Sequence, residues 1–257
     1  MYFKKIDFSK YSSLKIGTNV DVAIIEQDNE IFDGFIVGGA FNLLVSNNPQ
    51  NLLMLGKQYD FIRHERNSLF VGAATMAGRV YSFAKQNNLA GFEFLSHLPG
   101  TIGGLIAMNA GMKEYEIFGL IKRVRFQNGW LDKSQIKYEY RKAYLPSVAL
   151  EVELDANLGF NADMIDLFAK MRANQPKEPS AGSFFKNPSN DYAGRLIEAV
   201  GLKGHIIGGA QFSEKHANFL INIGNATFDD AVYLTNLAKK RVFEEFSITL
   251  ASEVKII

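Results

Sequence analysis

The sequence predicts an α+β protein in two main lobes, on three observations. Short apolar segments bounded by turn residues come first, helical spacing begins near residue 75, and helices alternate with strands after a polar, proline-containing linker at 175–179. No repeat or low-complexity tract interrupts the chain, so its whole length is expected to fold. With 257 residues, 47% of them hydrophobic, the chain is long enough to bury a sizeable core.

The strands of the first lobe are predicted from short apolar runs and from alternation of apolar and polar residues. Asn128-Gly129 is a hairpin signal between two of them, because this pair readily adopts the turn that joins antiparallel strands. The expected strands cover residues 21–25, 35–37, 52–55, 121–126 and 148–154.

Helices are predicted from apolar spacing and from their end signals. Thr75 is expected to cap a helix ending near Asn87, with Met76, Val80, Phe83 and Ala84 on one face. Gly201 is expected to end a helix over 191–200. Thr227 with Asp230 resembles a capping box, and the helix that follows repeats apolar residues at 231, 234, 238 and 242. Residues 217–223 and the tail 254–257 are strand-like.

Charge and composition exclude several classes of protein. Lys and Arg total 28 against 27 Asp and Glu, so we expect neither a nucleic acid nor an anionic membrane as partner. The charged N-terminus does not suit a signal peptide, and we expect a cytoplasmic protein. The uncharged stretch 94–112 contains Pro99 and several glycines, which favours a loop entering a buried segment over a membrane span.

Two residue types limit the chemistry. The absence of cysteine excludes disulfides, thiolate metal sites and thiol nucleophiles. The four histidines are scattered without metal-ligand spacing, so no catalytic metal is expected.

Three glycine-containing clusters are candidate ligand loops, and each has an ordinary structural alternative. In 37–45, glycines between strands indicate either a turn that approaches a phosphate or a tight turn. The segment 98–111 is neither a dinucleotide fingerprint nor a Walker loop; it suits either a large pyrophosphate-bearing cofactor or a packed loop. In 179–188, Ser183 is followed by two phenylalanines and then by polar residues. This combination indicates either a small-ligand site or a serine in a turn.

In their order and spacing these clusters resemble the UDP-N-acetylenolpyruvoylglucosamine reductase family, flavoenzymes of peptidoglycan precursor synthesis. The likeness covers nearly the entire chain. The matching segments are residues 13–17, 38–45, 91–95, 99–104, 108–111, 138–141, 181–188, 193–198, 208–210, 215–217 and 253–254.

The resemblance implies a fold and a domain plan. Residues 1–173 would form an FAD-binding lobe of the vanillyl-alcohol-oxidase type, with two subdomains split near residue 56. Residues 174–245 would form an α/β substrate-binding domain, and the tail 246–257 would return toward the first lobe. The family's compact type is expected, as a monomer, with little room between residues 25 and 35 for the helix usual there.

The resemblance also implies ligands and the residues that hold them. The cofactor would be FAD, the hydride donor NADPH and the substrate UDP-N-acetylenolpyruvoylglucosamine. Lys186, Asn187 and Lys215 are the candidate substrate contacts. The candidate FAD contacts are Gly38, Gly39, Ala40, Phe41, Asn42, Leu43, Pro99, Gly100, Thr101, Ile102, Gly103, Gly104, Asn109 and Gly111.

Three catalytic residues follow from the same likeness. Ser183 would give a proton to the substrate, Arg141 would grip its carboxylate, and Glu253 would assist as a protonated acid with a raised pKa. From spacing alone, Arg141 reads as a surface arginine after a strand, and Glu253 as a residue on the solvent face of the last strand.

The chain departs from the family pattern at Ala40-Phe41, where Gly-Ser is usual, and at Ala143, where serine is usual. Two other classes therefore stay open. One is a flavin-free sugar-nucleotide-binding protein, and the other is a different FAD oxidoreductase on the same fold.

Overall fold

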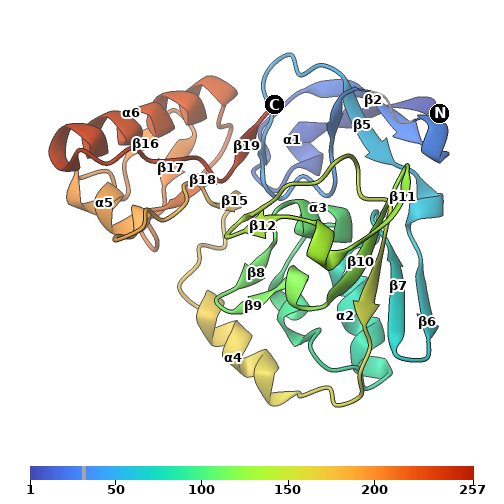
Figure 1. The fold of residues 1–257 in the computed structure, drawn as a ribbon. Coiled ribbons are helices and arrows are strands. Elements are labelled where there is room, and N and C mark those ends of the chain that lie inside the picture. The colour runs from blue at the N-terminus through green and yellow to red at the C-terminus, as the bar shows by residue number, and fades with distance from the viewer. Residues whose placement is uncertain (31–32) are drawn as a thin grey trace. The chain divides into compact units, whose positions relative to one another are not determined.

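The computed structural model describes residues 1–30 and 33–257, which divide into two compact units (Figure 1). Unit 1 comprises Met1–Lys4, Val22–Gly39 and Asn51–Ala173; unit 2 comprises Lys5–Asp21, Ala40–Gln50 and Asn174–Ile257. The division at 173–174 coincides with the predicted start of the second domain, but two N-terminal segments join unit 2. They do so because Leu14, Ile16 and Leu44 pack in its core. Which unit binds which ligand stays a prediction.

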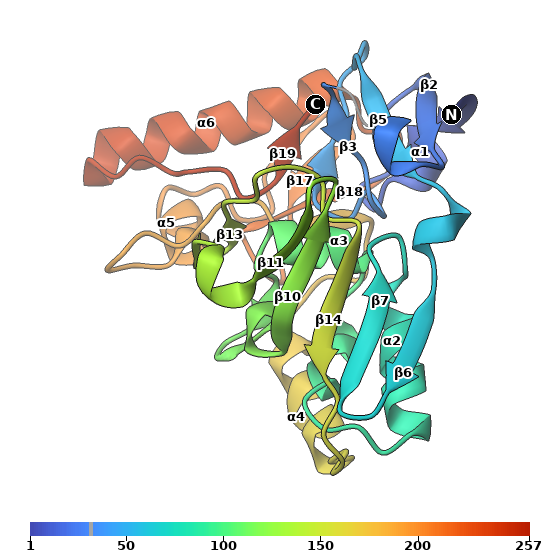
Figure 2. The same ribbon diagram turned by 45° about the vertical axis from the view of Figure 1, so that its right-hand side comes forward.

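A five-stranded antiparallel sheet is the largest element of unit 1 (Figure 2). The strand order is β11-β10-β14-β7-β6, and the Asn128-Gly129 hairpin joins β10 to β11 as predicted. The strands are β6 (Ile62–Glu65), β7 (Ser68–Gly72), β10 (Ile121–Phe126), β11 (Gly129–Asp132) and β14 (Glu151–Asp155).

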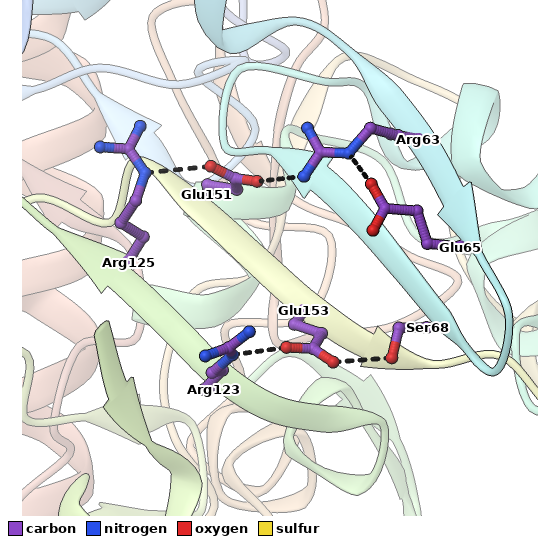
Figure 3. Close-up of polar contacts among 7 residues, drawn as sticks. All are labelled: Arg63, Glu65, Ser68, Arg123, Arg125, Glu151 and Glu153. Carbon is purple, nitrogen blue, oxygen red and sulfur yellow. Dashed lines mark hydrogen bonds and ion pairs between the residues drawn. The ribbon is translucent and has the colours of Figure 1, made fainter. Parts of the chain in front are cut away.

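Alternation along these strands separates a dry face from a charged one. Val124 of β10 and Val152 of β14 are fully buried in the main core, where helices α2 (Ala77–Gln86), α3 (Ile102–Ala107) and α4 (Asp163–Arg172) also contribute side chains. Their sequence neighbours point to the opposite face, where Arg123 pairs with Glu153 and Arg125 with Glu151 (Figure 3).

Glu153 shows how this charged face tolerates burial. The residue is only 9% exposed, and burial alone would raise its pKa. Hydrogen bonds from Ser68 and Arg123 outweigh that cost and lower the pKa of Glu153, so it stays ionised (Figure 3). The two glutamates on this face are therefore paired with arginines and do not form an unpaired acidic patch.

A second sheet has the strand order β1-β2-β5-β3, in which β2, β5 and β3 are parallel. The chain leaves it after β5 and enters the five-stranded sheet at β6. Asp28–Glu30 forms a single 3-10 turn, and the rest of the short predicted connection includes residues 31–32, outside the described residues. The strands are β1 (Tyr2–Asp7), β2 (Asn19–Ile25), β3 (Phe35–Ile36) and β5 (Leu52–Leu55).

Unit 2 is built on a four-stranded antiparallel sheet of order β15-β18-β17-β16, with α5 and α6 contributing to its core. A parallel pair joins β4 (Leu43–Leu44) to the tail strand β19 (Lys255–Ile256), so the tail pairs with a segment that the sequence assigned to the first lobe. The other elements are α1 (Phe8–Tyr11), β15 (Ser180–Ser183), α5 (Ala193–Ala199), β16 (Ile206–Ile207), β17 (Ala210–Phe212), β18 (Phe219–Asn222) and α6 (Phe228–Phe246).

The α+β prediction is confirmed, and so are the capping box of Thr227 and Asp230 and the stop at Gly201. The predicted cap of α2 is wrong. Met76 occupies the cap position and is 38% exposed, whereas Thr75 is buried and donates its hydroxyl to the Phe61 carbonyl. No helix among the described residues is long and apolar enough to cross a membrane.

Candidate functional site

Ser183 ends strand β15 at an irregularity in the ladder with β18. The register shifts between Ser180 and Ser183, and Gly182 has φ 81°, a conformation that favours glycine. Such bulges re-aim the side chain that follows them. Ser183 is half-buried and pairs with Phe219 across the ladder.

Glu253 lies beside the residue that follows Ser183. The Glu253 main-chain N–H donates to the Phe184 carbonyl at 2.8 Å, and Phe185 bridges Ser252. Glu253 is half-buried, so it does not lie on a fully solvated strand face. The fold of unit 2 thus brings two of the three predicted catalytic residues together from positions 70 residues apart.

Asn42 joins the same group. Its side-chain amide donates to the Glu253 carbonyl at 3.0 Å, and the Lys255 N–H donates to the Asn42 carbonyl at 3.0 Å. Leu43, another predicted cofactor contact, is buried in β4 opposite Lys255. Ala40 has φ 54°, so the position where the family usually has glycine carries a strained alanine here.

Unit 1 brings Arg141, Asn109 and Gly111 together. The Arg141 guanidinium donates to the Gly111 carbonyl at 2.8 Å and to the Asn109 carbonyl at 3.4 Å. Its Nη1 lies 3.7 Å from Glu116, and only 16% of its side chain is exposed, so it is not a surface arginine. Arg141 and Asn109 both have positive φ, 57° and 39°, a kind of backbone strain found at functional sites.

Gly38 and Thr101, one residue from each of two predicted cofactor segments, lie next to each other in unit 1. A Cβ built on Gly38 would lie 2.5 Å from the Thr101 hydroxyl, so a larger residue would force Thr101 to shift. Thr101 caps α3 by accepting from the Gly104 N–H, while the N–H groups of Ile102 and Gly103 donate to the Thr75 and Ala73 carbonyls. Those three donors are therefore engaged within the protein.

The remaining predicted residues occupy varied places. Gly39 and Phe41 are half-buried, Pro99 is exposed, and Gly100 has φ 113°. The Asn187 side chain accepts from the Ala193 N–H at the start of α5, and the Lys186 N–H donates to the Ala251 carbonyl. Lys215 is exposed, on the turn before β18. No group of three His, Asp or Glu in the described ranges could hold a metal ion.

Comparisons with known proteins identify the family to which the chain is similar. The family model "UDP-N-acetylenolpyruvoylglucosamine reductase, C-terminal domain" matches residues 175–257. The chain is 48% identical to the reductase of that name from Helicobacter hepaticus and 44% identical to that from Helicobacter pylori, each alignment covering 98% of both chains. The crystal structure of the Thermus caldophilus enzyme superposes with a TM-score of 0.87 at 27% identity, covering 100% of this chain and 99% of that one.

The chain belongs to the UDP-N-acetylenolpyruvoylglucosamine reductase family.

Two residues near the predicted site residues could not be identified from the sequence: Arg172 and Asn218. Arg172 ends α4, one turn after Phe168, whose ring packs against Tyr115 at 5.1 Å between centroids. Tyr115 belongs to β9 (Tyr115–Glu116), which pairs with β8 (Gly111–Met112), and Arg141 bonds Gly111 of β8. The charge of Arg141 lowers the pKa of Arg172, so the two arginines lie close enough to repel each other. Recognising the helix over 163–172 would place Phe168 and Arg172 on one face, but not near Arg141. The other residue is Asn218, which is nearly fully buried before β18.

Arg172 adds positive charge near Arg141. Its Nε is buried and has no hydrogen-bond partner among the described residues. Burial and repulsion from Arg141 lower the pKa of Arg172, and burial together with Arg172 lowers the pKa of His97. An anion bound near these groups would relieve the repulsion.

Proposed function

We propose that this chain is an FAD-dependent reductase that uses NADPH to reduce the enolpyruvyl double bond of UDP-N-acetylenolpyruvoylglucosamine, giving UDP-N-acetylmuramate. The observation that carries the proposal is full-length likeness: 48% identity to a reductase of this name over 98% of both chains. Relatives named for one reaction, aligned from end to end, support a shared activity more strongly than a common fold does.

The two glycine-containing segments assigned to the proposed FAD lie next to each other. A Cβ built on Gly38 would lie 2.5 Å from the Thr101 hydroxyl, so the two segments border one region. We propose that residues 38–43 and 99–104, with Asn109 and Gly111, hold the cofactor. When bound, FAD supplies the hydride transfer between NADPH and the substrate.

Three side chains supply the rest of the chemistry. Hydride addition to the terminal carbon leaves negative charge that spreads toward the substrate carboxylate. We propose that Arg141 binds this carboxylate through its planar donors, and that Glu253, holding a proton, donates a hydrogen bond where the charge develops. Ser183 gives its proton to the neighbouring carbon, which completes the reduction.

The charge around Arg141 supports this assignment. Arg141 and Arg172 lie close enough to repel each other, and Glu116 pairs with Arg141. Such a site favours an anionic ligand because the ligand screens the two cations from each other. Lys186, Asn187 and Lys215 are the proposed contacts to the uridine diphosphate part.

Flavin content is the first test. The purified protein should be yellow, and anaerobic NADPH should bleach it. The enolpyruvyl substrate should then restore the flavin absorbance, and light scattering should report a monomer. A colourless protein that takes up no added FAD would indicate a flavin-free binding protein, the alternative that the strained Ala40 favours. Bleaching that the substrate cannot reverse would indicate a different oxidoreductase.

A further inference from the structure

Asn218 is a buried asparagine whose side chain replaces part of a β-ladder. It lies immediately before β18, with 2% of its surface exposed. Its carbonyl accepts from the Phe184 N–H at 2.7 Å. Its side-chain Oδ1 accepts from the Phe185 N–H at 3.0 Å, and Nδ2 donates to the Phe185 carbonyl at 2.8 Å. Asn218 therefore satisfies three main-chain groups in the two residues after Ser183.

The side-chain amide is chemically specific for this position. The Phe185 N–H requires an acceptor and the Phe185 carbonyl requires a donor, and one asparagine side chain presents both. An aspartate of the same size presents two acceptors, so one oxygen would face the Phe185 carbonyl. Since the site excludes water, that unpaired contact would displace the Phe184–Phe185 main chain.

The same segment is held from its other side by the C-terminal tail. The Phe184 carbonyl accepts from the Glu253 N–H at 2.8 Å, and the Lys186 N–H donates to the Ala251 carbonyl at 2.8 Å. The segment Phe184–Lys186 thus lies between Asn218 and residues 251–253. A displacement at Asn218 would move Ser183, one residue before this segment, and would also move the main chain of Glu253.

We propose that Asn218 is a positioning residue for the proton-transfer step, because its amide clamp on Phe184–Phe185 fixes the register in which Ser183 and Glu253 stand. The inference rests on the proposed function, since it assigns a role to Asn218 in that reaction. Asn218 acts through its contacts to the Phe184 and Phe185 main chain.

The test compares Asn218→Asp with Asn222→Asp. Asn222 is a matched control: it is 9% exposed, belongs to β18, and uses its amide to bond the Leu14, Lys15, Gly224 and Ala226 main chain, away from Ser183. Circular dichroism and FAD content are recorded first. If Asn218→Asp does not fold, Asn218→Gln, which keeps both amide groups one methylene further out, replaces it.

The readout is the two half-reactions, followed separately by stopped-flow flavin absorbance. Asn218→Asp should leave bleaching by NADPH within about twofold of the wild type, and should slow reoxidation by the enolpyruvyl substrate by about 10- to 100-fold, as a misplaced reacting group does. Asn222→Asp should leave both rates unchanged. In a Ser183→Ala background, Asn218→Asp should slow reoxidation less than it does in the wild type, because the part of its effect that acts through the serine is already lost.

Three results would overturn the inference: equal slowing of both half-reactions, equal slowing by Asn222→Asp, or full additivity with Ser183→Ala. Each would make Asn218 a purely structural residue. Failure of the proposed function is distinguishable, since the wild type itself would then lack flavin or would fail to be reoxidised by the substrate.

Discussion

Replacing Ser183 by alanine separates the two half-reactions of the proposed mechanism. The change removes one hydroxyl from a half-buried position that does not have positive φ. Among the described residues no hydrogen bond to the Ser183 hydroxyl is present, so the free energy of unfolding should change by less than about 0.5 kcal/mol. The variant therefore reports on chemistry rather than on folding.

The expected size of the effect distinguishes two roles for the serine. A hydroxyl that only hydrogen-bonds the substrate contributes about 0.5–1.5 kcal/mol, or roughly 10-fold at most. A proton donor contributes about 100- to 10,000-fold, equivalent to about 2.7–5.4 kcal/mol in the barrier. Reoxidation should fall into the second range, while bleaching by NADPH continues at the wild-type rate.

Anaerobic stopped-flow measurement of flavin absorbance gives both rates in one preparation. NADPH alone reports the first half-reaction, and the substrate added to the reduced protein reports the second. Equal slowing of both, or a loss of reoxidation below about 10-fold, would refute the assignment of proton transfer to Ser183.

Four further changes have defined outcomes. Arg141→Lys keeps the charge but loses the planar pair of donors, so the KM for the enolpyruvyl substrate should rise about 10-fold, with bleaching by NADPH unaffected. Ala40→Gly should raise the free energy of unfolding in urea by about 1 kcal/mol, because φ is 54° there; no gain would contradict the strain. Gly111→Ala should lower it by about 1–3 kcal/mol, since the new Cβ would lie 2.1 Å from a carbonyl across the β8–β9 hairpin. Gly119→Ala, with open space around its Cβ, is the control. Burial lowers the pKa of His216 below its ordinary 6.5, so the unfolded chain takes up the proton first and stability should fall as pH drops below about 6.5. His216→Gln should flatten that slope, and an unchanged slope would contradict the assignment.

Local signals in the sequence predicted most elements of the fold. The alternation in 121–126 and the Asn128-Gly129 turn specify the β10–β11 hairpin, and the Thr227 capping box specifies the start of α6. The sequence predicted Thr75 as the cap of α2, but the Thr75 hydroxyl donates a hydrogen bond to the Phe61 carbonyl instead. Tertiary contacts override a local preference worth only about 1 kcal/mol.

The candidate site divides in the same way. The motif around Ser183 can be read from the sequence because glycine, serine and their polar neighbours are adjacent in it. Arg172 and Asn218 cannot be found in this way, since their importance comes from partners that are distant in the chain: Arg141 for the first and Phe184–Phe185 for the second. An asparagine before a strand is otherwise an ordinary turn residue.

By itself the sequence determined the α+β class, the turn and cap positions and the family to which the chain belongs, because these depend on residue type and short-range spacing. Only the tertiary structure decided that residues 40–50 and the tail join one unit and that Glu253 stands beside Phe184. It also decided that the Asn218 side chain bonds the Phe185 main chain, two residues after Ser183. Main-chain hydrogen bonds between distant segments carry no residue-specific signature, so their pairing emerges only when the chain is folded.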